Sequence, residues 1–305
     1  LGAYVIRVPQ DGWAPEGWTP PAADDSTSGM RTTANVSAAN AIKTPQFWLL
    51  WTALFCNVTA GIGILNQASP MAQDFFAGIG PAAAAGYVGL LSLANMAGRI
   101  VWSSTSDYIG RKPTYMMYLG VGAVLYLLVA LFGTASMLVF VLLTAVIISY
   151  YGGGFATVPA YLKDIFGEYQ VGAIHGRLLT AWAAAGVAGP LIVSGVLDLQ
   201  TSRGAEGAAL YELSLYIMVG ILVLGFLANL LVRPVNDRFH EPEADDTAAD
   251  EDEPQEASDA GTEHGPEDGA SGAERTAAIL LWILVGAGLV YGIVETALNA
   301  TALFG

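Results

Sequence analysis

Long apolar runs separated by short polar turns make up most of the chain. Six of these runs have about the 20 residues that an α-helix needs to cross a bilayer. They lie at about 47–69, 83–105, 114–133, 137–159, 173–197 and 210–232, and a further apolar run covers about 277–303. The pattern predicts an all-α membrane protein, with a six-helix bundle at 47–233 and one additional transmembrane helix at 276–305.

Three segments lie outside these predicted helices. Residues 1–8 (LGAYVIRV) resemble the end of a preceding transmembrane helix, so we expect the chain to be the C-terminal part of a longer protein. Residues 9–46 are rich in Pro, Gly, Asp, Ser and Thr up to Thr44 and are expected to form a solvated loop. Residues 234–275 are strongly acidic and are expected to form a disordered linker.

The distribution of Lys and Arg predicts the orientation in the membrane. One set of loops holds nine bases and the opposite set holds one, which places the first set in the cytoplasm. The nine are Arg7, Arg31, Lys43, Arg111, Lys112, Lys163, Arg177, Arg233 and Arg238, and the one is Arg203. We therefore expect a multi-pass protein of the plasma (inner) membrane, with the loop at Arg111 and Lys112 and the acidic linker in the cytoplasm.

Composition and charge exclude several classes of protein. Hydrophobic residues make up 54% and charged residues 13% of the chain, which excludes an ordinary soluble domain. The net charge of −15 is local, because residues 237–274 hold 15 of the 27 acids and one of the 12 bases. Without a basic face, nucleic acid is not an expected partner.

Residues with catalytic or metal-binding chemistry are sparse in the sequence. No nucleophile–base pair and no cluster of metal ligands is found, so we expect no enzyme activity, cofactor or metal. The three histidines, His175, His240 and His264, are placed in loops or in the acidic tail. His175 is read either as a solvated loop residue or as a pH sensor.

The predicted helix at 83–105 carries one buried base, Arg99. It lies eight residues before Asp107, and therefore about 12 Å inside the end of the helix. A cation at this depth is costly, by roughly 2.5–3.5 kcal/mol on insertion scales, and usually faces a cavity or a partner. Ser92, Asn95, Arg99, Ser103 and Ser106 form one polar stripe. The pattern favours an anion pathway over a snorkelling arginine or a structural clamp between helices.

Other polar and small residues lie within the predicted helices. The first span carries Asn57, Thr59, Asn66 and Gln67 and is expected to break at Pro70; these side chains either bond to other helices or line a pore. In the fourth span Tyr150 and Tyr151 precede three glycines and could reach a cavity. In the fifth span Trp182, Gly186 and Gly189 share a face, and the small residues predict tight packing. No carboxylate lies well inside the six spans, so no acidic proton carrier is expected there, and the one central charge is positive, which favours an anionic substrate.

The turn Asp107-Tyr-Ile-Gly-Arg-Lys112 resembles the signature loop of the major facilitator superfamily. That resemblance implies the C-terminal half, helices seven to twelve, of a twelve-helix bundle, with residues 9–46 as the loop between the halves. It also implies that Asp107, Gly110, Arg111 and Lys112 form a gating loop. The chain has Ser103 and Tyr108 where the family pattern has a glycine and a base, which puts the strength of the gating contacts in doubt.

Two further segments resemble the oxalate–formate antiporter branch of this family. They are Asn95-Met-Ala-Gly-Arg99 and the run from Thr180 to Pro190. The resemblance implies that Arg99 holds the substrate carboxylate. This branch has a lysine where the chain has Trp182, which disfavours a dicarboxylate. Monocarboxylate carriers have a proton-linked aspartate where the chain has Asn95, which disfavours that coupling device.

The final apolar run at about 277–303 carries small and polar residues along one side. Gly288, Gly292, Glu295 and Asn299 lie along one side, which predicts docking against another helix unless Glu295 is simply solvated at the outer interface. The segment from Tyr291 to Phe304 resembles the single-helix small subunit that is sometimes associated with the antiporter branch. We therefore expect a fused small-subunit-like helix at the end of the chain.

These observations lead to one expected function and two alternatives. The expected function is secondary active transport, by alternating access, of a small carboxylate anion such as formate, lactate or pyruvate, by exchange or symport. The expected substrate-binding residues are Arg99, Asn95, Trp182, Tyr150, Tyr151 and Gln67. The expected partners are the anion, the N-terminal half of the transporter and the lipid bilayer. The alternatives are a carrier that exports lipophilic drugs, with a structural Arg99, and a membrane sensor or scaffold without transport.

Overall fold

The computed structural model describes residue 32, residues 34–241 and part of the segment 283–298, namely residues 283, 286, 287, 290, 291, 293, 294 and 298. The expectations for residues 1–31, for most of the acidic linker and for Gly288, Gly292, Glu295 and Asn299 therefore lie outside the described residues.

The described part of the chain is helical and contains no strand. Its elements are α2 (Ala38–Ala41), α3 (Pro45–Phe75), α4 (Pro81–Ile109), α5 (Arg111–Phe132), α6 (Met137–Phe166), α7 (Val171–Leu178), α8 (Thr180–Ser202), α9 (Ala209–Leu231) and the short helix η1 (Asp237–Phe239). Six helical segments are long and apolar enough to cross a membrane, with α7 and α8 together forming one of them. The prediction of an all-α membrane protein with a six-helix bundle is confirmed.

Local signals explain where two of these helices begin and where one continues. The Thr44 side chain accepts a hydrogen bond from the Phe47 backbone N–H, and Pro45 occupies the first turn of α3, where its missing N–H costs nothing. Gly110 separates α4 from α5 at a φ of 90°, a conformation that favours glycine. The expected break at Pro70 is wrong, because α3 continues to Phe75. Pro70 is exposed near the helix end, where the carbonyl left without a partner is least costly.

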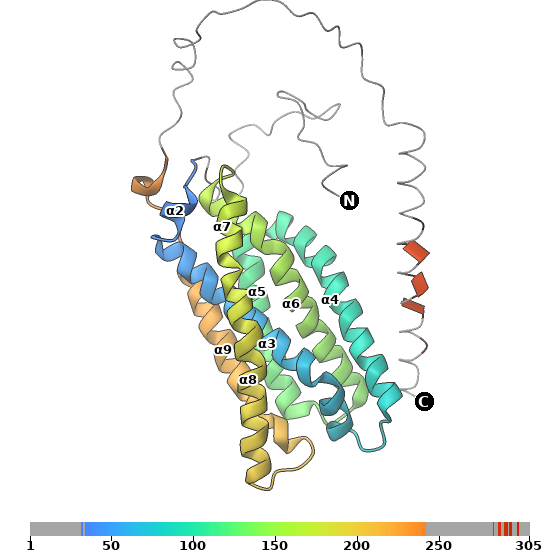
Figure 1. Ribbon diagram of the computed structural model, residues 1–305. Coiled ribbons are helices and arrows are strands. Elements are labelled where there is room, and N and C mark those ends of the chain that lie inside the picture. The colour runs from blue at the N-terminus through green and yellow to red at the C-terminus, as the bar shows by residue number, and fades with distance from the viewer. Residues whose placement is uncertain are drawn as a thin grey trace, which may run out of the picture.

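The helices pack as one bundle with α3 against most of its neighbours. It contacts α4, α6, α8 and α9, and 61% of its most apolar stretch is buried. The corresponding fraction is 28% for α4 and for the α7–α8 segment, so these two are the least covered spans. Figure 1 shows α2 and α7 at one end of the bundle and the α8–α9 connection at the other.

Glycines let α4 and α6 approach backbone to backbone. A Cβ atom added to Gly98 would lie under 3.0 Å from the Ser149 carbonyl oxygen, and one added to Gly152 would lie equally close to the Asn95 carbonyl oxygen. The next two glycines of α6 serve other neighbours, since Gly153 faces Trp102 and Tyr118 and Gly154 faces Asn57. The glycine triplet therefore positions α6 against α3, α4 and α5 at once.

Residues 34–44 differ from the expected solvated loop. Val36 and Ala41 are fully buried, and the Val36 N–H donates to the Phe166 carbonyl at 2.9 Å. The Asn35 side chain accepts from the backbone N–H groups of Glu168 and Tyr169. Composition alone missed this order because the segment is held by backbone groups of the distant α6–α7 connection.

The first residues of the acidic segment are also ordered. Glu241 Oε1 accepts hydrogen bonds from the Ser37 N–H and from the Asn40 side chain, and the Glu241 N–H donates to the Asn35 carbonyl. Together with the Gln170 side chain, which accepts from the Ala38 N–H at 2.8 Å, these bonds join three segments. We call residues 34–44, 164–177 and 232–241 the end cap.

Candidate functional site

Arg99 lies on α4 with its side chain exposed and makes two contacts. Its Nε donates to the Asn95 side-chain oxygen at 3.3 Å, one helical turn earlier. Its guanidinium carbon lies 5.2 Å from the centroid of the Phe155 ring on α6. Within residues 34–241 no carboxylate lies at ion-pair distance from Arg99, and neither Nη atom has a hydrogen bond. The charge is therefore available to an anion.

Phe155 joins Arg99 to Trp182. The Trp182 ring packs edge-on against Phe155 with 4.2 Å between the centroids, and both side chains are partly buried. The two predicted residues Arg99 and Trp182 are therefore both brought into contact with one aromatic ring. Sequence reasoning missed Phe155, although it lies four residues after Tyr151 and therefore on the same face of its helix.

Tyr150 and Tyr151 are largely buried and point to different helices. Tyr150 packs against Trp102 at 5.1 Å and Tyr118 at 5.5 Å, whereas the Tyr151 ring lies against Gly61 of α3. Both tyrosines line a cavity of about 10 Å³, room for one water molecule. Asn57 lines the same cavity, is 4% exposed and has a side-chain oxygen without a hydrogen bond to any described group.

Gln67 lies in a different place. It lines a second cavity of about 20 Å³, among Met71, Tyr211, Ser214 and other residues of α3, α5, α8 and α9. Ser214 is 4% exposed, and its hydroxyl has no hydrogen bond to a described residue. Arg99, Asn95 and Phe155 do not line this cavity, so the structure does not bring Gln67 to Arg99.

Of the two α8 glycines that were predicted to pack tightly, Gly189 does so and Gly186 does not. Gly189 packs closely on α3, where an added Cβ would lie 3.1 Å from the Thr59 carbonyl oxygen. An added Cβ at Gly186 would meet no atom within 4 Å, so the predicted tight packing on the face of Trp182 is wrong at this position. The open position beside Trp182 leaves space next to the aromatic pair.

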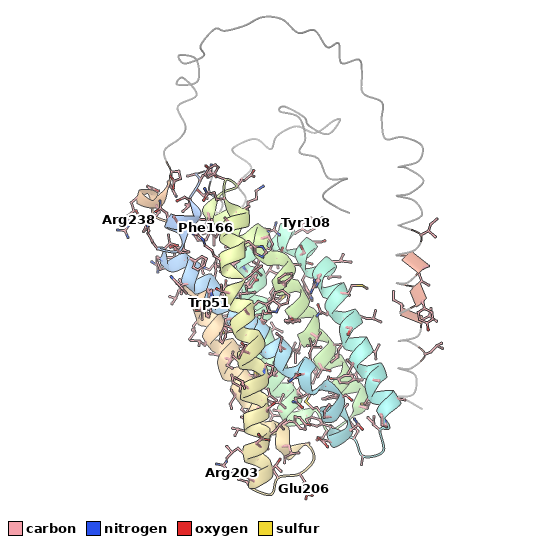
Figure 2. All side chains as sticks on the ribbon, in the orientation of Figure 1. Trp51, Tyr108, Phe166, Arg203, Glu206 and Arg238 are labelled. Carbon is pink, nitrogen blue, oxygen red and sulfur yellow. The ribbon has the colours of Figure 1, made fainter. Side chains whose placement is uncertain are left out.

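The predicted gating residues tie helix ends together. Arg111 pairs with Asp107, bonds to the Ser106 hydroxyl, and places its Nε 3.8 Å from Asp164 at the end of α6. Lys112 donates to the Val232 carbonyl at 2.6 Å, after the end of α9. Tyr108, where the family pattern has a base, is 90% exposed and lies at the α7 end of the bundle in Figure 2.

His175 does not lie in a loop as expected. It is part of α7, and its ring centroid is 6.5 Å from that of Phe155. Its Nε2 is buried and has no hydrogen-bond partner among the residues described. The predicted span at 173–197 already included His175, so the helical position agrees with that span and not with the loop assignment.

No group of His, Cys, Asp and Glu side chains that could hold a metal occurs in the described part of the chain. The chemistry available around Arg99 is therefore that of one cation, one amide and an aromatic wall formed by Phe155 and Trp182. Such a set can bind a small anion through charge and hydrogen bonds.

Comparison with known proteins agrees with this architecture. The sequence model of the Major Facilitator Superfamily matches residues 7–190 and 50–304. The chain is 28% identical over 158 residues to the "Oxalate:formate antiporter" of Oxalobacter formigenes, which covers 52% of this chain and 37% of that protein. It is 24% identical over 159 residues to the "Uncharacterized MFS-type transporter YhjX" of Escherichia coli strain K12, covering 51% and 38%.

The matched regions thus span less than two thirds of these relatives, and both relatives are distant in sequence. The family match is broader, because it extends over most of the chain. With six membrane-length helices and the Asp107–Lys112 turn also present, the chain belongs to the major facilitator superfamily of membrane transporters.

Proposed function

We propose that the carrier to which this chain belongs transports small organic carboxylate anions, in particular a monocarboxylate such as formate, lactate or pyruvate. The observation that carries the proposal is the state of Arg99. It is a guanidinium on a membrane-length helix, exposed on one of the least covered spans, with no carboxylate partner among residues 34–241.

The geometry of Arg99 suits a carboxylate. The Asn95 bond uses only Nε and holds the guanidinium in place, so both Nη atoms remain free to donate. Paired donors of this kind bind a carboxylate through two parallel charge-assisted hydrogen bonds, which are about twice as strong as neutral ones. In a site shielded from water the charge interaction is stronger still.

The surroundings of Arg99 support a single negative charge on the substrate. Trp182 takes the position of a lysine in the antiporter branch, and it packs on Phe155 without contributing a charge. A second carboxylate of the substrate would then lose its hydration without gaining an ionic partner, which disfavours binding. The distant likeness to a protein named oxalate:formate antiporter supports a carboxylate substrate of some kind.

We further propose that transport proceeds by alternating access against a second six-helix half, with Arg99 facing the interface between the halves. The ion pairs of Arg111 would stabilise one closed arrangement of the α4–α5 turn. The excess of bases at this end of the bundle supports a cytoplasmic location of the end cap and the acidic linker in an inner membrane.

The test uses the full-length carrier in liposomes. We expect uptake of labelled formate, lactate or pyruvate to exceed uptake of oxalate, and Arg99→Ala to reduce it about 100-fold or more, because the guanidinium that binds the carboxylate is lost. The matched control is Arg203→Ala, which removes an exposed arginine at the opposite end of the bundle (Figure 2) and should leave uptake unchanged. Unchanged uptake in Arg99→Ala would refute the proposal.

Export of lipophilic compounds is the second candidate. The Phe155–Trp182 wall beside Arg99 provides aromatic surface that such compounds could contact. Inhibition of transport by lipophilic cations without competition by carboxylates would favour this alternative, whereas competition by lactate alone would exclude it.

A further inference from the structure

The Phe155 ring is a meeting point of three other helices. Arg99 of α4 lies over the ring at 5.2 Å, Trp182 of α8 packs edge-on at 4.2 Å, and His175 of α7 lies at 6.5 Å. Arg99 and Trp182 were expected at the substrate site from the sequence. The structure adds the imidazole of His175 to the same aromatic contact.

His175 and Trp182 lie on one continuous face. They are seven residues apart, and α7 is followed by α8 after the single residue Leu179. Seven residues are close to two helical turns, so the two side chains project in the same direction about 10 Å apart along the axis. His175 is the one nearer the α2 end of the bundle, where α7 lies (Figure 1).

The buried Nε2 of His175 requires an explanation. It has no hydrogen-bond partner within the described residues, whereas buried polar atoms of native proteins are nearly always paired. A solvated histidine would have this nitrogen exposed to water. An unpaired nitrogen next to the wall of an anion site is instead free to meet a ligand when the aromatic side chains move.

The charged groups of α7 and of the end of α6 have partners of their own. Lys163 pairs with Glu168, Arg177 donates to the Ala38 carbonyl, and Asp164 pairs with Arg111. The titratable side chains on helices packed against α7 are Cys56 and Asp74 of α3, Tyr150, Tyr151, Tyr161, Lys163 and Asp164 of α6, and Asp198 of α8, while α2 has none. No described carboxylate lies at ion-pair distance from His175.

We propose that His175 is a second anchor for the carboxylate substrate, effective when it is protonated. The inference rests on the proposed function. Uptake of one proton from water by the unpaired nitrogen converts the imidazole to an imidazolium, which adds one positive charge and one N–H donor. This charge replaces, at acidic pH only, the lysine that is absent at Trp182. Arg99 and His175 then both present a positive charge next to the Phe155 ring.

The experiment measures lactate binding to the purified full-length carrier at pH 5.5 and pH 7.5, where lactate is ionised throughout. We expect the Kd for lactate of the unaltered protein to be about tenfold lower at pH 5.5 than at pH 7.5. The reason is that the added positive charge of His175 attracts the lactate carboxylate. His175→Gln should show the pH 7.5 affinity at both pH values. His175→Lys should bind tightly at both, because its charge is retained.

The matched control is His240→Gln, which removes the other histidine of the described region, 3.7 Å from Asp237 in the end cap. It should keep the full pH dependence. An unchanged pH dependence in His175→Gln overturns the inference, and so does an equal loss in His240→Gln. Failure of the unaltered protein to bind lactate at either pH refutes the proposed function itself. Binding that depends on Arg99 but not on pH refutes only the role of His175.

Discussion

Arg99 and Arg111 are twelve residues apart in the sequence and lie in opposite surroundings. Arg111 pairs with Asp107 and Asp164 and bonds to the Ser106 hydroxyl, and its side chain is 11% exposed. Arg99 contacts an amide and an aromatic ring, and its side chain is exposed. The comparison separates a cation that holds helix ends together from one whose charge is left for a ligand.

The end cap and the middle of α4 differ in the same way as the two arginines. The end cap is dense in hydrogen bonds: Arg177 donates to the Ala38 carbonyl and Lys112 to the Val232 carbonyl, while Arg111 forms an ion pair with Asp164. The middle of α4 is held to α6 by glycine contacts and carries its polar side chains outward. Charges are thus paired at the end cap, whereas the unpaired charge of Arg99 lies on a helix held by close backbone contacts.

The test with the largest expected effect replaces each of the two arginines by lysine, in separate variants. Arg99→Lys keeps the charge but loses the planar pair of donors, so we expect carboxylate uptake to fall about 10- to 100-fold. Arg111→Lys can still pair with Asp107 and Asp164 and should lower uptake only a few-fold. Initial rates in liposomes measure both. Equal losses in the two variants would mean that the two sites do not differ in kind.

The second test concerns the glycine contact below Arg99. Gly98→Ala places a methyl group against the Ser149 carbonyl, which cannot move without displacing α6, so we expect a loss of about 1–3 kcal/mol in stability. Gly220→Ala on α9 is the matched control, because an added Cβ there meets nothing within 4 Å. Thermal unfolding in detergent compares the two. Similar unfolding midpoints in the two variants would show that the close α4–α6 contact does not contribute to stability.

The third test changes the charge of the wall. Trp182→Lys adds a positive charge to the aromatic wall, and we expect oxalate to compete with lactate about tenfold better than before, since a second carboxylate then has a partner. Trp182→Leu, which removes the ring without adding charge, is the control. If oxalate competes equally well in Trp182→Lys and Trp182→Leu, the size of the side chain at position 182 and not its charge selects the substrate.

The smallest expected effect comes from the aromatic contact itself. Phe155→Leu removes the cation–π contact with Arg99, and we expect the KM for lactate to rise about two- to fivefold, in line with about 0.5–1 kcal/mol. Phe239→Leu removes a similar contact with Arg238 in the end cap, at 4.6 Å, and should leave the KM unchanged. Transport kinetics over a range of lactate concentrations provide the measurement.

Much of the fold could be predicted because its signals are local. The six apolar runs are long enough to be recognised one by one, and the i, i+4 spacing of Asn95 and Arg99 already implied that these side chains meet. The ordered residues 34–44 could not be recognised in this way. Their partners, such as the Phe166 carbonyl and the Gln170 side chain, are more than 120 residues away.

The candidate site shows the same division between local and distant partners. The sequence alone determined that one arginine lies deep in an apolar helix and that no carboxylate accompanies it within the spans. Only the tertiary structure decided that Arg99, Trp182 and His175 meet at the Phe155 ring, and that Gln67 belongs to another cavity. Helical periodicity determines which side chains of one helix share a face. Which faces meet depends on how six helices pack, and that is decided by close contacts such as Gly98 against Ser149 and Gly152 against Asn95.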